Sequence, residues 1–357
     1  MESVEKGNKH PELTFNSEQL QTISENYGIS SLHFVERPAH GTITNNAIVE
    51  SDAGERYFIK AYRSEQMYKV ATTHRVAEVA AVDPSIPVTL PLVPLTGTYS
   101  ITVAGCSVIL FPLEQGTTTY PSSPEDRHTL ITNMATMLGR IHAVPVPTDD
   151  TLLKPIERWQ PEAREKRVEM LEKVVRWAAE ANQSEFDTLA LKSAQEKLHL
   201  LDSLPVVTAT ESTQALCHAD YHPGNVAHNN DMEVTAIFDW DNAGIADPNI
   251  DFLNMLMMNM NNENRLAETI QSGLLEKMIP SYQESRNTQI DVSTFRDAYC
   301  LLLHERVGTA WPMYQHYYNG STQNDDKVEI LQQRAHFLAD NHKRIWNAIE
   351  AAVLKTQ

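Results

Sequence analysis

A carboxylate, a carboxamide and a second carboxylate are spaced along this chain as phosphoryl transfer from a metal-bound nucleotide requires. They are Asp220 and Asn225 of the run His218-Ala-Asp-Tyr-His-Pro-Gly-Asn225, and Asp239, which ends the strand-like run Val234–Asp239. In such a reaction one aspartate lies beside the attacking hydroxyl, while an asparagine and another aspartate hold Mg²⁺. The spacing of the first two residues is weak evidence by itself. The second aspartate follows an apolar run one short hairpin later, and this order makes the interpretation much stronger.

Length, composition and charge limit the classes of protein to which this chain can belong. The 357 residues exceed the usual size of one core, so two packed lobes are expected, and 41% apolar content is enough to form them. A formal net charge of −18 argues against nucleic acid or an anionic membrane as the main partner. Three separated cysteines, an N-terminus without an apolar signal core, and the lack of a membrane-length apolar run predict a soluble cytoplasmic protein. The oligomeric state is left open.

The first hundred or so residues have mostly strand patterns. Alternating and β-branched residues predict five strands, and a tight Ala104-Gly105 turn joins the last two. After the third strand, Ser64 is a candidate N-cap, and a helical period continues to Val79. We therefore expect a five-stranded antiparallel sheet with one inserted helix. The predicted strands are 32–36, 46–50, 56–62, 99–103 and 107–111.

Helix patterns dominate beyond Pro112. Pro124 marks a helix start, and one apolar face continues to His142. Residues 156–204 are charged, rich in alanine and poor in glycine, which predicts a pair of helices before the motif that contains Asp220. The chain is again helical beyond Pro248. The second part of the protein should therefore be mainly α-helical.

The order of these parts carries more information than any single motif. A strand lysine, Lys60, precedes a helix glutamate, Glu78, then an apolar strand, and finally the aspartates and the asparagine. In this order the chain resembles the aminoglycoside phosphotransferase and choline kinase family, which are small-molecule relatives of the protein kinases. The resemblance covers roughly residues 32–251. Its most specific parts are the runs His218–Asn225, Ile237–Gly244 and Asp247–Asp251.

The resemblance implies an α+β, bilobal protein-kinase-like fold, with a small antiparallel sheet lobe that carries one helix and a larger, mostly helical lobe. Residues 1–111 would form the nucleotide-binding lobe. Residues 112–357 would form the catalytic and acceptor-binding lobe, with residues 151–204 as its helical insert. The implied activity is Mg²⁺-dependent transfer of the γ-phosphoryl group of ATP or GTP to a hydroxyl of a small molecule.

The resemblance also assigns roles in the catalytic lobe. Asp220 resembles the catalytic aspartate that orients the acceptor hydroxyl and accepts its proton. His218 belongs to the same catalytic motif, where the family's histidine bonds backbone carbonyls and shapes the loop. Asn225 and Asp239 would bind Mg²⁺ through hard oxygen atoms. Asp241 would touch a second metal ion or the substrate, or would cap the following turn.

Lys60 is implied to bind the nucleotide phosphates from its strand. Glu78 is the expected ion-pair partner of Lys60, and Glu65 is a competitor that helix phase does not exclude. The segment 38–46 departs from the G-x-G-x-x-G loop of protein kinases because it contains a single glycine. A hairpin with polar donors takes that place in the small-molecule kinases, which makes Gly41 and Thr42 candidate phosphate contacts.

The strand end at Phe111 would form the hinge that binds adenine through backbone hydrogen bonds. Pro112 has no N–H to donate, so the contacts should come from nearby carbonyls and from the Leu113 amide. This expectation completes the implied nucleotide site.

Two other classes of function are compatible with parts of the same pattern. A nucleotide-binding module without catalysis would usually have lost the aspartates, and both are present here. A metal-dependent hydrolase leaves Asn225 and Lys60 without a function. Such a hydrolase would take its metal ligands from His218, Asp220, His222 and Asp239.

The acceptor is not fixed by the sequence. Aminoglycosides, choline or ethanolamine, homoserine, other sugars or antibiotics, and a protein acceptor all remain open. Clustered carboxylates attract cations, so an amine-bearing alcohol is expected. The carboxylates placed on or near the catalytic face by this argument are Asp220, Asp241, Asp247, Asp251 and Glu305. For Asp247 and Asp251 the family pattern also implies structural support of the metal strand and of the next helix.

Overall fold

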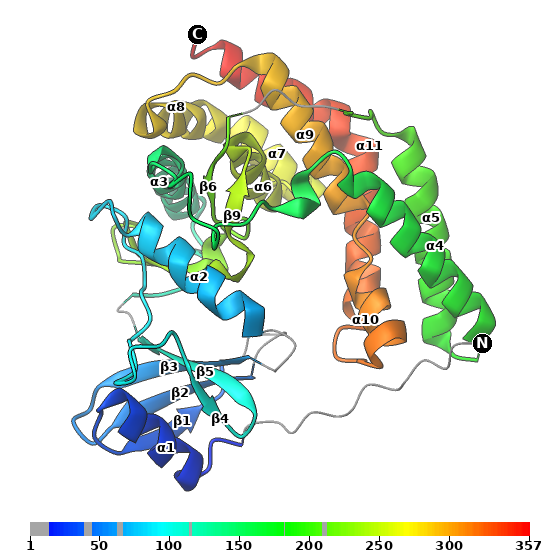
Figure 1. Cartoon of the computed structure of the whole chain (residues 1–357). Coiled ribbons are helices and arrows are strands. Elements are labelled where there is room, and N and C mark those ends of the chain that lie inside the picture. Colours follow the sequence, from blue (N-terminus) through cyan, green and yellow to red (C-terminus); the bar gives the residue numbers. More distant parts are fainter. Residues whose placement is uncertain (1–13, 39–44, 63–66, 114–115, 182, 209–212) are drawn as a thin grey trace.

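The computed structural model describes residues 14–38, 45–62, 67–113, 116–181, 183–208 and 213–357 (Figure 1). Gly41, Thr42 and Glu65 lie outside the described residues, so the structure does not place these three predicted contacts. A sheet with its own helix occupies one end of the molecule, and helices make up most of the other end (Figure 1). This arrangement confirms the expected α+β fold class.

A five-stranded antiparallel sheet forms the N-terminal part, in the order β1-β2-β3-β5-β4. Alternate residues of the central strands point to the same face of the sheet. On one face Val49, Ile59 and Leu110 are fully buried and belong to one core. The five predicted strands are confirmed. Their bounds are β1 Leu32–Glu36, β2 Asn45–Ser51, β3 Arg56–Tyr62, β4 Ile101–Val103 and β5 Cys106–Pro112.

A helix that the sequence analysis did not predict, α1 (Ser17–Tyr27), covers the buried side of this sheet. Leu20 and Ile23 of α1 belong to the same core as the sheet residues. The helix begins at Asn16, whose side chain accepts a hydrogen bond from the backbone of Gln19, and the Gln19 side chain accepts one from Asn16 in return. The N-terminal part of the chain therefore contains two helices, where the sequence predicted one.

The inserted helix α2 (Met67–Ala80) follows β3 as predicted, but it packs toward the larger helical part. Val76 and Ala80 are fully buried, and they share the large core of the helical part and not that of the sheet. In Figure 1, α2 lies between the sheet and the helices above it. The side chains of α2 can therefore reach groups that the second part of the chain supplies.

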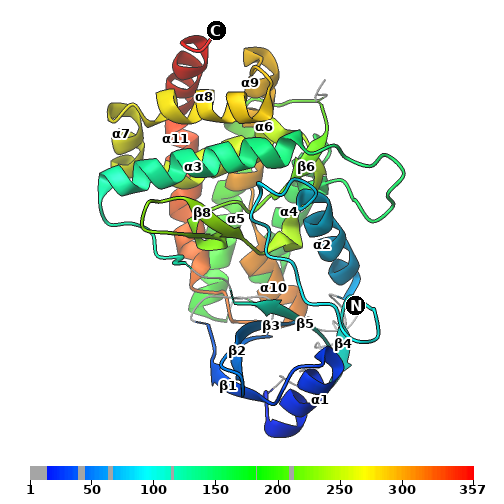
Figure 2. The ribbon, with the colours of Figure 1, turned by 90° about the vertical axis from the view of Figure 1, so that its left-hand side faces the viewer.

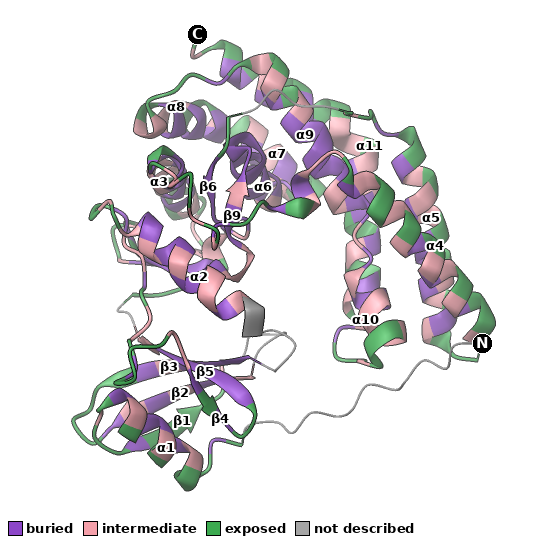
Figure 3. Cartoon of the chain, viewed as in Figure 1, coloured by how far each residue is buried: buried purple, intermediate pink, exposed green. Residues whose placement is uncertain are grey.

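The second part is mainly helical, as expected. The predicted helix at Pro124 and the predicted pair before the catalytic motif are present as α3, α4 and α5. The helix α6 is buried almost throughout and lies in the middle of this part (Figure 3). The helices are α3 Pro124–Ala143, α4 Ala163–Ala181, α5 Glu185–Ser203, α6 Pro248–Asn259, α7 Glu263–Gln271, α8 Leu274–Arg286, α9 Val292–Val307, α10 Trp311–Asn319 and α11 Lys327–Leu354.

Two small antiparallel sheets position the catalytic motif. One pairs β6 (Ala215–Cys217) with β9 (Gly244–Ala246), and the other pairs β7 (Val226–His228) with β8 (Val234–Ile237). Figure 2 shows β8 between the five-stranded sheet and α3. The motif residues lie in the loops that leave β6 and β8. No helix among the described residues is long and apolar enough to cross a membrane.

Candidate active site

Asp220 lies in the loop between β6 and a short 3₁₀ turn at Pro223–Asn225. Its side chain is partly exposed and keeps few contacts: the Asn242 amide donates to Oδ2 at 3.4 Å, and His222 Nε2 lies 3.8 Å from Oδ1. A carboxylate held this loosely can still accept a hydrogen bond from an incoming hydroxyl. The geometry therefore suits the base that the sequence predicted.

His218 is fully buried beneath this loop, where both of its ring nitrogens are used. Nε2 lies 3.1 Å from the Phe238 carbonyl oxygen, and Nδ1 accepts the backbone N–H of Asp220 at 3.3 Å. These bonds tie the catalytic loop to the segment that follows β8. His218 shapes the loop, and it has no free nitrogen for a metal ion, so the ligand set required by the hydrolase alternative is not formed.

Asp251, in the first turn of α6, supports the catalytic loop from below. Its two oxygens accept the backbone N–H groups of His218 at 2.7 Å and of Ala219 at 3.1 Å. Ala219 has a φ of 64°, a left-handed conformation that costs a non-glycine residue roughly 1–2 kcal/mol. The two charge-assisted bonds offset this cost and fix the backbone immediately before Asp220.

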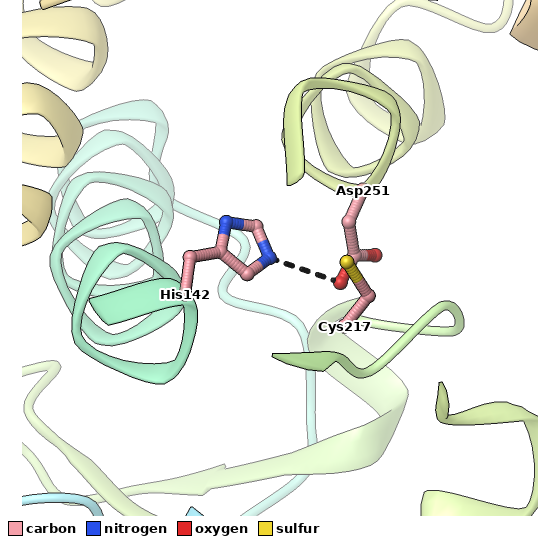
Figure 4. A group of neighbouring side chains, drawn as sticks. All are labelled: His142, Cys217 and Asp251. Atoms are coloured by element: carbon pink, nitrogen blue, oxygen red, sulfur yellow. Dashed lines mark hydrogen bonds and ion pairs between the residues drawn. The ribbon is translucent and has the colours of Figure 1, made fainter. Parts of the chain in front are cut away.

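His142 of α3 extends this support, since its Nε2 lies 3.3 Å from Asp251 Oδ2 (Figure 4). Its Nδ1 lies 2.7 Å from the Tyr282 hydroxyl. Burial raises the pKa of Asp251, but the bonds from His142 and the loop hold that pKa below its ordinary value. Cys217 lies beside the pair (Figure 4). Burial raises the pKa of the Cys217 thiol, and both Asp251 oxygens are occupied, so these three residues form a structural cluster and not a ready metal site.

Asn225 and Asp239, the two expected Mg²⁺ ligands, come from neighbouring segments. The Asn225 amide donates to the Asp220 carbonyl at 2.9 Å, which leaves its Oδ1 for another partner. The backbone carbonyl of Asn225 accepts the Phe238 N–H at 3.1 Å, and Asp239 is the next residue after Phe238. The Asp239 side chain is 42% exposed, and its φ of 63° places it in the left-handed region. Two hard oxygen donors, one of them a solvent-accessible carboxylate, fit the preference of Mg²⁺ for few protein ligands beside phosphate and water.

Lys60 of β3 joins the sheet to these acidic residues. Its Nζ lies 2.7 Å from Asp239 Oδ1 and 2.9 Å from Asp241 Oδ2. The Tyr62 hydroxyl donates to the other oxygen of Asp241 at 2.6 Å. Burial lowers the pKa of Lys60, but the two carboxylates outweigh it and raise that pKa above its ordinary value. Lys60 in turn holds the pKa of Asp239 down against the opposing effect of burial.

The structure does not bring Glu78 to Lys60. Glu78 Oε2 pairs with Arg75 Nη1 at 3.2 Å, one turn earlier on α2, and Arg75 also pairs with Asp150. The contact of α2 with the site is instead made by Thr73, whose hydroxyl lies 3.4 Å from Asp241. The expected Lys60–Glu78 pair is therefore wrong for this structure, because the phase of α2 directs Glu78 away from β3.

The Leu113 amide, which was expected to contact adenine, also has another partner in this structure. The Leu113 N–H donates to the Arg56 carbonyl at 3.0 Å, as a continuation of the β3–β5 pairing. Phe111 pairs with Phe58 across the same two strands and is partly buried. The Leu113 amide is therefore already used within the sheet.

A sequence profile of the phosphotransferase enzyme family matches residues 35–285, which is well over half of the chain. The chain belongs to this family. The match confirms the resemblance to the aminoglycoside phosphotransferases and the expectation of an enzyme that transfers a phosphoryl group. No curated protein sequence was found to match.

Solved structures of other phosphotransferases share the fold. An aminoglycoside phosphotransferase from Alicyclobacillus acidocaldarius is 15% identical over 98% of both chains, with a TM-score of 0.57. A spectinomycin phosphotransferase, solved with ADP and spectinomycin, is 16% identical over 95% of this chain and 99% of its own, with a TM-score of 0.58. An amicoumacin kinase, solved with AMP-PNP and Ca²⁺, is 15% identical over 93% of both, with a TM-score of 0.56. These similarities confirm the kinase-like fold.

Tyr62 and Thr73 are among the residues of the candidate site that were not predicted from the sequence. Tyr62 could have been found, because residues two apart on a strand share a face, and Tyr62 is two residues after Lys60. Thr73 had no signal beyond its place on α2. The division of the phosphotransferase into residues 1–111 and 112–357, with an insert at 151–204, stays a prediction.

Proposed function

We propose that this phosphotransferase moves the γ-phosphoryl group of Mg²⁺-bound ATP or GTP to a hydroxyl of a small molecule. The observation that carries the proposal is the cluster of Asp220, Asn225, Asp239 and Lys60. In it a lysine of the sheet contacts Asp239, and hydrogen bonds place Asn225 and Asp239 on neighbouring segments next to Asp220. Residues 1–111 would bind the nucleotide, and residues 112–357 would supply the base and bind the acceptor.

Each residue has a separate task in the proposed reaction. Asp220 orients the acceptor hydroxyl and receives its proton at a carboxylate oxygen. Lys60 binds a phosphate of the nucleotide, and His218 and Asp251 keep the loop in place. Asn225 and Asp239 would hold Mg²⁺, which neutralises charge on the phosphates when bound. Asp241 positions Lys60, since both of its oxygens face Lys60 or Tyr62.

The similar structures support a small-molecule acceptor. Their names include spectinomycin, amicoumacin and macrolides, all of which are small molecules. An amine-bearing acceptor was expected from carboxylates near Asp220, but these have other partners. Asp241 pairs with Lys60, Asp247 caps α6, Asp251 is buried under the loop, and Glu305 lies between arginines. The proposal therefore does not extend to an amine-bearing acceptor.

The base is tested by Asp220→Asn, which keeps the shape of the side chain and removes its basicity. With an acceptor found by screening hydroxylated metabolites and antibiotics for ADP or GDP release, we expect kcat to fall by about 10²–10⁴-fold. Nucleotide binding, measured by calorimetry, should change little. Asp231→Asn, which alters an exposed acid in the β7–β8 turn, is the matched control. Full turnover by Asp220→Asn would remove Asp220 from the mechanism.

A further inference from the structure

A group of arginines lies next to the catalytic loop in the helical part of the molecule. Arg158 Nε lies 3.8 Å from Glu305 Oε1, and Arg306 Nε lies 3.4 Å from Glu305 Oε2. A third guanidinium, that of Arg167, donates to the Arg158 carbonyl and interacts electrostatically with Glu305. Three positive charges thus surround one carboxylate, and the group carries an excess of positive charge.

This arginine group adjoins the proposed base. Arg158 Nη2 donates to the Ala219 carbonyl at 2.8 Å, and Ala219 immediately precedes Asp220. Arg306 donates to Asn254 of α6. The pKa of His222, which lies beside Asp220, is lowered mainly by burial, and the charge of Arg306 adds to this effect. The side chains of Arg158 and Arg306 are 36% and 31% exposed, so both remain open to a bound molecule.

The guanidiniums keep capacity for a ligand. Each has five N–H donors, and the contacts with Ala219, Asn254 and Glu305 use only some of them among the described residues. The geometry of the Arg306–Glu305 contact is not that of a hydrogen bond, since neither Arg306 Nε nor Glu305 Oε2 has a hydrogen-bond partner in the described part of the chain. An oxyanion can bind two parallel donors of such a fork.

A cavity of about 280 Å³ borders His222. Its polar lining comes from Tyr120, His222, Asn259, Asn261 and Arg265. None of the residues that line this cavity is acidic. Arg265 lies over the Tyr120 ring at 5.2 Å and pairs with Glu268 at 3.4 Å. Arg265 and two asparagines therefore border His222 at this cavity, in addition to the arginine group that contacts the loop before Asp220.

From these contacts we infer that the acceptor carries an oxyanion, a carboxylate or a phosphate, which binds Arg306 and Arg158 while its hydroxyl lies at Asp220. The inference rests on the proposed function and replaces the amine-bearing acceptor expected from clustered carboxylates and an acidic chain. The local field decides the sign here, because interactions beyond about 8–10 Å are largely screened at physiological salt. The overall charge of −18 is therefore a poor guide to this one face.

The test compares matched acceptors that differ in charge. We would measure kcat/KM by ADP or GDP release for glycerate against glycerol, glycerol 3-phosphate against glycerol, and homoserine against its methyl ester, with choline and an aminoglycoside as cationic probes. The expected result is a preference for the anionic member of at least one pair by tenfold or more, which shrinks as ionic strength rises. The carboxylate and phosphate pairs distinguish the two sources of the oxyanion.

Variants then assign the preference to the arginines. Arg306→Gln should reduce the anionic advantage by about tenfold to a hundredfold and change kcat/KM for the neutral member little. Arg306→Lys keeps the positive charge but lacks the two parallel donors of a guanidinium, and it should restore part of the preference for the anionic acceptor. Arg296→Gln, an exposed arginine on the same helix, is the control. Arg158→Gln gives a second variant if Arg306→Gln does not fold.

Several outcomes would overturn the inference. Preference for neutral or cationic acceptors would do so, and so would a lack of turnover with every anionic acceptor. An equal loss for both members of a pair in Arg306→Gln would assign the arginine a purely structural role. In each case, Mg²⁺-dependent nucleotide binding and the effect of Asp220→Asn on any turnover would still test the proposed function separately.

Discussion

Lys60 makes two ion pairs, and one of them is with a carboxylate that a metal-bound nucleotide would also use. Asp239 is one of the expected Mg²⁺ ligands, and Lys60 is the expected phosphate ligand, yet their side chains bond to each other at 2.7 Å. A carboxylate and an ammonium that are this close neutralise one another and hold the site together without any ligand. A nucleotide with its Mg²⁺ would supply a new opposite charge to each of them, so the exchange of partners is electrostatically balanced.

This exchange predicts the behaviour of Asp239→Ala. The variant loses a metal ligand, while Lys60 keeps Asp241 as a partner at 2.9 Å, so the fold should survive. We expect the Mg²⁺-dependent part of nucleotide binding to disappear in calorimetry performed with and without Mg²⁺. Asp231→Ala should retain the wild-type Mg²⁺ dependence. If Asp239→Ala bound nucleotide with the same Mg²⁺ dependence as the wild type, Asp239 would not be a metal ligand.

The types and the order of the site residues could be predicted from the sequence, but most of their partners could not. Asp220 and Asn225 are five residues apart in one loop, so local geometry keeps them together. Glu305 lies far along the chain from Arg158, and only the folded structure shows that it is neutralised there. Counting carboxylates near a motif therefore does not show which of them already have partners in the folded chain.

At the scale of elements, α2 connects the sheet to the catalytic part through a different residue than expected. Its buried residues face the large core, which fixes the rotation of the helix and leaves Glu78 on the partly exposed side with Arg75. An i,i+3 pair of this kind contributes only about 0.2–0.5 kcal/mol. Thr73, which reaches Asp241, is the residue through which α2 contacts the site.

Substitutions on α2 test this assignment. Glu78→Gln should leave the KM for the nucleotide within about twofold of wild type, since the lost pair is weak and distant from Lys60. Thr73→Val should raise that KM more, because it removes a donor that faces Asp241. Both are measured by nucleotide titration at a saturating acceptor concentration. A tenfold rise in KM for Glu78→Gln would show that Glu78 acts on Lys60 after all.

The strands were predicted better than the helices of the N-terminal part. Buried residues alternate with partly buried ones along β2, which is a direct consequence of the pleat, whereas the last four residues of β3 are all buried. The helix α1 was missed although Asn16, Gln19 and Gly28 provide a capping box and a left-handed C-cap. Such short signals need the neighbouring sheet to confirm them, because a helix of 11 residues is marginal in isolation.

At the scale of the whole molecule, stability depends on histidines that the fold buries in the neutral form. His74 of α2 is 4% exposed, lies against the Tyr99 ring at 4.8 Å, and has no hydrogen-bond partner for Nε2 among the described residues. Burial lowers its pKa to about 4, although a bond with the Tyr99 backbone opposes the shift. Burial also lowers the pKa of His142 beneath the catalytic loop.

These shifts make the molecule sensitive to mild acid. A histidine has a pKa of about 6.5 in the unfolded chain, so below that pH the unfolded state binds a proton that folded His74 does not, and the free energy of unfolding falls. Between pH 7 and pH 5 the loss due to His74 should be about 2 kcal/mol, and it should level off near pH 4. Urea denaturation at each pH would show a shallower decline for His74→Gln than for wild type. His199→Gln, which alters an exposed histidine, should follow the wild-type curve. Equal slopes for wild type and His74→Gln in this range would mean that His74 is protonated as readily in the folded chain as in the unfolded one.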